Sequence, residues 1–142
     1  MHRTARRAFT LVEILIVVVI LGILAAVVVP QFARATQDAQ GVATLDQLTK
    51  LRRALAVYYV RCNAMYPGVS AGSGTWGELL SGGYMKVAPM NNWVGGPNAG
   101  VITLGNGPDT GYHQNYGWIY DAPTGSVWAA GFDGDDEPYP RP

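Results

Sequence analysis

The sequence predicts an α+β protein in which one long N-terminal helix packs on a small antiparallel β-sheet domain. Residues 9–29 form an apolar run with a single charge, apolar side chains then recur every three or four positions between 45 and 62, and short β-rich runs follow from residue 101. The recurring spacing is one apolar face of a helix. A small sheet packed on that face buries the apolar surface of both elements.

Charge is balanced overall but unevenly placed along the chain. Ten Lys and Arg residues match ten Asp and Glu residues among 142, and three of the arginines lie in the first eight residues. From Ala64 onward the sequence has seven acidic residues and only two basic ones, Lys86 and Arg141. This half is therefore not expected to bind nucleic acid or an anionic membrane. The single cysteine, Cys62, cannot close an internal disulfide and is expected to be a half-buried small residue of the helix.

The apolar run is long enough to cross a membrane. Residues 9–29 are 21 in number with Glu13 as the only charge, and at about 1.5 Å per residue a helix of that length spans roughly 30 Å. Only a helix satisfies its own backbone in lipid. The arginines before the run place the N-terminus in the cytoplasm and the rest outside. The alternative is a secretory signal peptide cut after Ala35. Two features count against it: the run is longer than the apolar region of a usual signal peptide, and a signal peptide has no use for the charge of Glu13.

Residues 6–13, Arg-Arg-Ala-Phe-Thr-Leu-Val-Glu, resemble the type IV prepilin and pseudopilin signature. The resemblance implies a leader at 1–8, a cut between Ala8 and Phe9 by a prepilin peptidase, and methylation of the new N-terminal Phe9. Glu13 then takes the acidic fifth position of the mature chain. The family nearly always has Gly where Ala8 stands, and we expect the cut to be slowed or tolerated, not lost.

The same resemblance gives Glu13 a role in assembly. Cleavage frees an α-amine on Phe9, with a pKa of about 7.7–8 in an ordinary setting. In the family model, Glu13 of one subunit neutralises this amine on a neighbour, and pairing offsets much of the cost of burying both charges. Gly22 and Pro30 match helix-weakening positions of the family: we expect a kink at Pro30, and the stretch between them either melts in a filament or forms a static bend.

The remaining chain divides into an amphipathic continuation of the helix, 30–62, and a globular domain, 63–142. The stripe of the helix comprises Leu45, Leu48, Leu51, Leu55, Tyr58 and Cys62. In the domain we expect a short helix at 75–80, with Thr75 as N-cap and Glu78 in a capping box. Strands are expected at 101–104, 116–120 and 126–130, the last two joined by a hairpin loop at 121–125. Aromatic residues in these segments are expected to pack in the sheet and loops, and not to form a carbohydrate platform.

Residues 66–67, 83–85, 89–93 and 131–134 resemble the globular half of a type II secretion pseudopilin, especially the major subunit. Type IVa pilins usually carry a C-terminal cysteine pair, which this chain lacks. The resemblance implies a structural subunit of a pseudopilus filament, first anchored in the bacterial inner membrane by one span. Its implied partners are further copies, other pseudopilins, the prepilin peptidase and methylase, and the inner-membrane assembly platform. The alternatives are a type IV pilus or DNA-uptake pilin, and a membrane-anchored periplasmic module that never polymerises.

The C-terminal part of the chain offers one candidate metal site and no catalytic site. The loop 133–137 carries Asp133, Asp135 and Asp136, and clustered carboxylates suit calcium; the resemblance to major pseudopilins implies such a site, whereas the alternative is a solvated acidic tail. No organic cofactor is expected. No catalytic motif is present, because His113 stands alone in a Gly- and Asn-rich loop. We therefore expect a protein that is not an enzyme.

Overall fold

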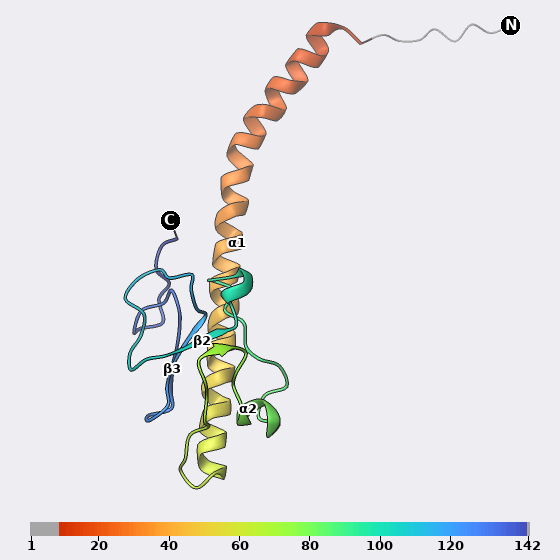
Figure 1. The fold of residues 1–142 in the computed structure, drawn as a ribbon. Helices are drawn as coiled ribbons and strands as arrows, with labels where there is room; N and C mark the ends of the chain where they lie inside the picture. Colours follow the sequence, from red (N-terminus) through yellow and green to blue (C-terminus); the bar gives the residue numbers. More distant parts are fainter. Residues whose placement is uncertain (1–8, 142) are drawn as a thin grey trace, which may run out of the picture. The chain divides into compact units, whose positions relative to one another are not determined.

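The computed structural model describes residues 9–141, and the chain divides into two compact units, Met1–Thr36 and Gln37–Pro142. The expected leader at 1–8, including Ala8, lies outside the described residues. Helix α1 runs from Leu11 to Arg61 and contributes to both units (Figure 1). The predicted long helix is confirmed, although it begins two residues later than Phe9.

The first unit presents an apolar helix that buries none of its side chains. Every residue from Phe9 to Thr36 is exposed, and the helix is long and apolar enough to cross a membrane. Its many Val and Ile residues do not disfavour the helix, since lipid leaves no other way to satisfy the backbone. The backbone is helical through both Gly22 and Pro30. Pro30 has no N–H, so the carbonyl of Ala26 lacks its usual helical donor.

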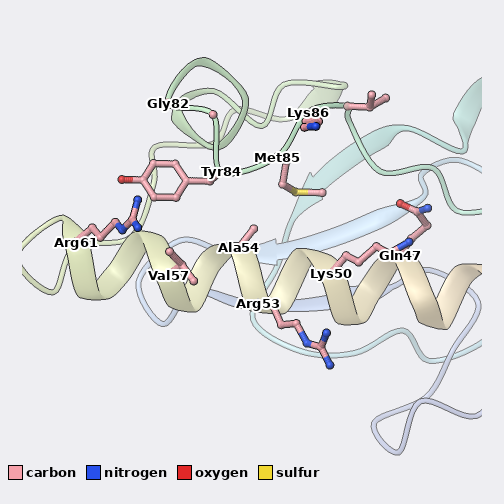
Figure 2. Close-up of a pocket in the computed structure, with 12 residues that line it drawn as sticks. Gln47, Lys50, Arg53, Ala54, Val57, Arg61, Gly82, Tyr84, Met85 and Lys86 are labelled. Atoms are coloured by element: carbon pink, nitrogen blue, oxygen red, sulfur yellow. The ribbon is translucent and has the colours of Figure 1, made fainter.

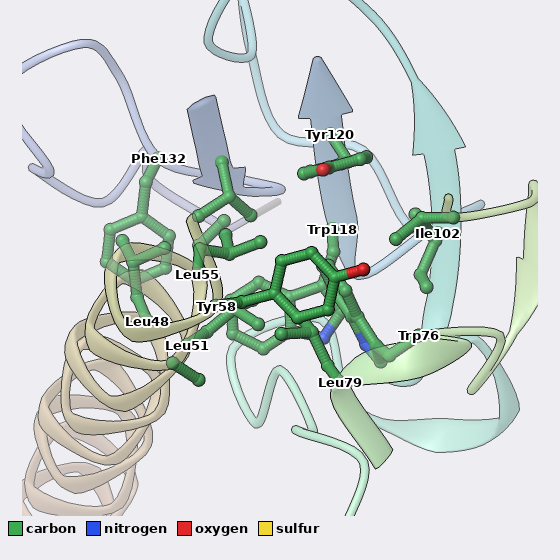
Figure 3. Close-up of a cluster of buried hydrophobic side chains, with 14 of the residues drawn as sticks. Leu48, Leu51, Leu55, Tyr58, Trp76, Leu79, Ile102, Trp118, Tyr120 and Phe132 are labelled. Atoms are coloured by element: carbon green, nitrogen blue, oxygen red, sulfur yellow. The ribbon is translucent and has the colours of Figure 1, made fainter. Parts of the chain in front are cut away.

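The second unit is built on the amphipathic half of α1. Leu48, Leu51, Leu55 and Tyr58 are buried, and Leu45 and Cys62 are half-buried against the same core. The predicted stripe is therefore the packed face of the helix. Figure 3 shows the side chains of Leu48, Leu55 and Tyr58 on the side of α1 that packs against the sheet.

The sheet has four strands in the order β1-β2-β3-β4: β1 (Gly72–Ser73), β2 (Val101–Leu104), β3 (Trp118–Asp121) and β4 (Ser126–Ala129). The three strands predicted from sequence are present, and β3 and β4 form the expected antiparallel hairpin. The prediction of an antiparallel sheet was wrong for one pair, because β2 and β3 are parallel. Residues 105–117 form a connection long enough to return the chain to the same end of the sheet, as a parallel pair requires.

Two short helices complete the unit, α2 (Glu78–Ser81) and η1 (Gly96–Asn98). The predicted capping box of α2 was wrong. Gly77, with φ 51°, takes the N-cap position without a side-chain bond, and the Thr75 hydroxyl donates to the Ser70 carbonyl instead. The Glu78 carboxylate accepts a hydrogen bond from the Tyr58 hydroxyl on α1. Glu78 thus ties α2 to the long helix, and this bond is the main reason that the Tyr58 pKa is raised.

Aromatic side chains fill the space between α1 and the sheet. Trp76, Trp118, Tyr120 and Phe132 are almost fully buried (Figure 3). The polar atoms of two of them find backbone partners: Trp118 Nε1 donates to the Pro89 carbonyl at 3.0 Å, and the Tyr120 hydroxyl donates to the Pro67 carbonyl at 3.1 Å. Burial raises the pKa of Tyr120 to about 12. These aromatic residues pack in the core, as the sequence predicted, which leaves those four unable to form a binding platform.

Asn91 is a fully buried polar centre that joins three separate segments. Its side-chain amide donates to the Gly117 carbonyl at 2.8 Å and to the Ala130 carbonyl at 2.9 Å. Its Oδ1 accepts the backbone N–H groups of Trp93 and Val94 at 2.9 and 3.0 Å. A Cβ at Gly117 would stand 2.1 Å from the Ala99 carbonyl oxygen. The backbone at this point is therefore held too closely for any larger residue.

Candidate functional site

The N-terminal end of α1 brings together two of the predicted site residues, Phe9 and Glu13. Phe9 is exposed, and Thr10 is the N-cap, since its carbonyl accepts the Ile14 N–H. Glu13 Oε2 accepts the Thr10 N–H and the Thr10 hydroxyl, both at 2.8 Å, while the Glu13 N–H donates to Thr10 Oγ1 at 3.2 Å. This reciprocal pairing is a capping box.

The capping box gives Glu13 a function that the sequence analysis missed. The pattern Thr-x-x-Glu before an apolar run was visible in residues 10–13 and is the usual sign of one. Both bonds use the same carboxylate oxygen, Oε2, and within residues 9–141 no partner is found for Oε1. One oxygen of an acid in an apolar helix is therefore left to meet a donor from another molecule.

The acidic loop, residues 133–137, is organised by its own first and fourth positions. Asp133 Oδ1 accepts the backbone N–H groups of Asp135 and Glu137 at 2.9 and 3.0 Å. Asp136, at φ 63°, forms a two-point ion pair with Arg52 of α1: Nη1 to Oδ2 is 2.5 Å and Nη2 to Oδ1 is 2.9 Å. Arg52 Nη2 also donates to the Val127 carbonyl at 3.2 Å. The loop is thus tied to both the helix and β4.

The calcium site expected at Asp133, Asp135 and Asp136 stays a prediction. Across residues 9–141, no three acidic, His or Cys side chains converge as metal ligands. Both oxygens of Asp136 already accept from Arg52, and Asp133 accepts from the loop backbone. Calcium needs six to eight oxygen ligands, so an ion bound through Asp136 would have to compete with Arg52 for that carboxylate. The sequence prediction did not consider Arg52, whose partner lies 84 positions away.

Arg52→Met is expected to lower the free energy of unfolding by about 1 kcal/mol, because a half-exposed two-point ion pair contributes little more than that. Arg53→Met is the matched control, since Arg53 is exposed and has no carboxylate partner among the described residues. Thermal melts of the two variants measure the difference. An equal loss of stability in Arg52→Met and Arg53→Met would contradict the assignment of Arg52 as the tether. Melts of the unmodified chain with millimolar calcium and with chelator test the predicted calcium site: a rise in melting temperature with calcium would support the site, and superimposed curves would contradict it.

Asp109 organises a second polar cluster that the sequence did not predict. It is buried, and it accepts from His113 Nδ1 at 2.6 Å and from the Gly131 N–H at 2.9 Å. The Tyr116 hydroxyl lies 3.4 Å from it. No Ser, Cys or Thr nucleophile is hydrogen-bonded to His113 in the described residues. The cluster therefore fastens the loop before β3 to the C-terminal segment, and His113 is not the isolated surface residue that was expected.

Comparison with known proteins agrees with these features. The model of the prokaryotic N-terminal methylation motif matches residues 3–29. Type II secretion system core protein G of Pseudomonas aeruginosa is 35% identical over 103 residues, which are 66% of this chain and 72% of that protein. The chain belongs to this core protein G family. It is a type II secretion pseudopilin, as the resemblance predicted.

Other relatives show how far the likeness extends. Core protein G of Klebsiella pneumoniae is 33% identical over 98 residues, covering 62% of this pseudopilin and 69% of that protein. A fimbrial protein of Neisseria meningitidis is 36% identical over 93 residues, covering 64% of this chain and 54% of that protein. The second match agrees with the wider likeness to type IV pilins. No solved structure matches the chain significantly.

Proposed function

We propose that this pseudopilin is cut between Ala8 and Phe9, methylated on Phe9, and assembled through α1 into the filament. The observation that carries the proposal is the first half of α1, which is apolar and exposed throughout up to Thr36 and has one acid, Glu13, in its first turn. Such a surface is stable only in lipid or among other helices. Before assembly the helix anchors the protein in the inner membrane, with the N-terminus in the cytoplasm and residues 37–142 in the periplasm.

The proposed partners follow from the same helix. Further copies and other pseudopilins surround it in the filament, the prepilin peptidase and methylase act at Ala8 and Phe9, and the inner-membrane platform receives the subunit. The domain of residues 37–142 acts as a structural module and not as an enzyme. The Asp109 carboxylate supports this, because it accepts the backbone N–H groups of Thr110 and Gly131 as well as the His113 ring.

Co-expression with a prepilin peptidase is expected to remove Met1–Ala8 and add a methyl group to Phe9. The measurement is the intact mass and the N-terminal sequence of the protein recovered from membranes. Ala8→Gly should be cut faster than the unmodified chain, because it restores the residue that the family nearly always has, and Phe9 stays available in both. A chain that stays uncut in both forms would contradict the proposal. A start at Thr36 would show an ordinary signal peptide instead.

A further inference from the structure

A groove runs along the outer side of the second unit, between α1 and the segment Gly82–Val87. Its volume is about 710 Å³. Figure 2 shows Tyr84 and Met85 reaching toward the helix above Ala54 and Val57. Val57 is 46% exposed and Val87 74% exposed, so apolar surface is open to solvent at the groove wall. The groove is therefore able to receive another chain and not only a small ion.

Positive charge of the second unit collects in this groove. The unit has six basic residues: Lys50, Arg52, Arg53, Arg61, Lys86 and Arg141. Arg52 is bound to Asp136, and Arg141 lies over the Trp93 ring at 4.2 Å and donates to Gln40. The other four line the groove.

These four cations are largely uncompensated. In the described part of the chain, only Lys50 has a carboxylate partner, Asp46 at 2.5 Å, and both side chains are more than half exposed. An exposed pair of this kind contributes little and is easily exchanged. The groove thus has a single sign of charge, in a unit whose acidic residues otherwise outnumber its basic ones. A partner with several free carboxylates is the occupant that this charge favours.

The chain itself carries such a partner in the acidic loop. Asp133 and Asp136 hold the loop together, whereas Asp135 and Glu137 are exposed and, within residues 9–141, their carboxylates have no partner. Within its own chain the loop is held beside β4 by Arg52, which bonds to both Asp136 and the Val127 carbonyl, and neither Arg52 nor a residue of the loop lines the groove. The matching surface is therefore one for a different copy.

We propose that the basic groove of one subunit receives the acidic loop of a neighbouring subunit, with Arg61 and Lys86 facing Asp135 and Glu137. This rests on the proposed assembly of the chain into a filament. The two surfaces differ, so the contact is head-to-tail, and contacts of that kind generate open helical filaments when the rotation between subunits does not close into a ring. The contact between the periplasmic domains fixes the position of one subunit relative to the next, in addition to the packing of the apolar helices. Because all four side chains are exposed, it weakens as salt is raised.

The test is a charge swap in the full chain, expressed with its peptidase and assembly machinery. Arg61→Glu with Lys86→Glu is expected to reduce pelletable filaments about tenfold, because carboxylates then face carboxylates. Adding Asp135→Lys and Glu137→Lys to the same chain should restore filaments to within about twofold of the unmodified level. The matched control adds Asp38→Lys and Asp121→Lys instead, which restores the net charge without touching the loop, and should not restore filaments.

One further measurement keeps the test decisive. Protease resistance of residues 37–142 in each membrane sample shows that the variants are folded. Filaments formed at the normal level by the groove variant, or restored equally by the control, would overturn the proposed docking while leaving filament assembly standing. Absence of filaments from the unmodified, processed chain would overturn assembly and the docking with it.

Discussion

Asn91→Ala is expected to lower the free energy of unfolding by about 3–4 kcal/mol, since each buried polar group left without a partner costs about 1–3 kcal/mol. The change leaves the Ala130 carbonyl without a donor and the N–H of Val94 without its acceptor, while the Gly117 carbonyl keeps the N–H of Ala130. A domain of this size has only about 5–15 kcal/mol of stability. The measurement is urea or thermal unfolding of the full chain in detergent, followed by near-ultraviolet circular dichroism of the buried tryptophans.

The neighbouring Asn92 provides the control for this change, because its side chain is exposed. Asn92→Ala should stay within about 0.5 kcal/mol of the unmodified chain, as surface substitutions usually do. Asn91→Asp is also expected to be strongly destabilising, because a carboxylate would then face the carbonyls of Gly117 and Ala130. A loss below about 1 kcal/mol in Asn91→Ala would show that water or a rearranged loop replaces these bonds.

The parts of the fold that follow from local pattern were predictable from the sequence. Leu48, Leu51 and Leu55 recur at helical spacing, and all three are buried. The strands around Trp118 and Val127 likewise followed from short apolar runs beside turn residues. In these segments the side-chain period alone decides which face is buried.

The parts that depend on distant partners were not predictable. Asn91 binds carbonyls 26 and 39 positions away, and Arg52 binds a carboxylate 84 positions away. Nothing in the neighbouring sequence indicates either partner. The same limit explains the wrong capping box at Glu78: a local pattern was present, but Tyr58, 20 positions earlier, is the partner of that carboxylate. Parallel pairing of β2 and β3 depends on where a long connection returns, which no local residue determines.

Glu13→Gln is expected to reduce filament assembly more than about tenfold, because breaking a buried ion pair costs about 3–5 kcal/mol. Glutamine keeps an oxygen that can accept the Thr10 N–H and hydroxyl, so the capping box survives. It removes only the negative charge, which in the proposed filament neutralises the amine of Phe9 on a neighbouring subunit. The measurement is the amount of pelletable filament relative to the amount of processed subunit in the membrane.

Thr10→Val separates the capping role of Glu13 from its charge. Valine removes the hydroxyl that donates to Glu13 and accepts its N–H, but it leaves the carboxylate in place. Loss of a cap costs about 1 kcal/mol. The apolar helix after Leu11 remains formed in lipid despite that loss, because lipid offers its backbone no other partners. Filaments should therefore form near the normal level. The reverse pattern, normal assembly in Glu13→Gln and loss in Thr10→Val, would make Glu13 a helix cap alone. Loss in Glu13→Gln with normal assembly in Thr10→Val would show that the charge registers one subunit on the next.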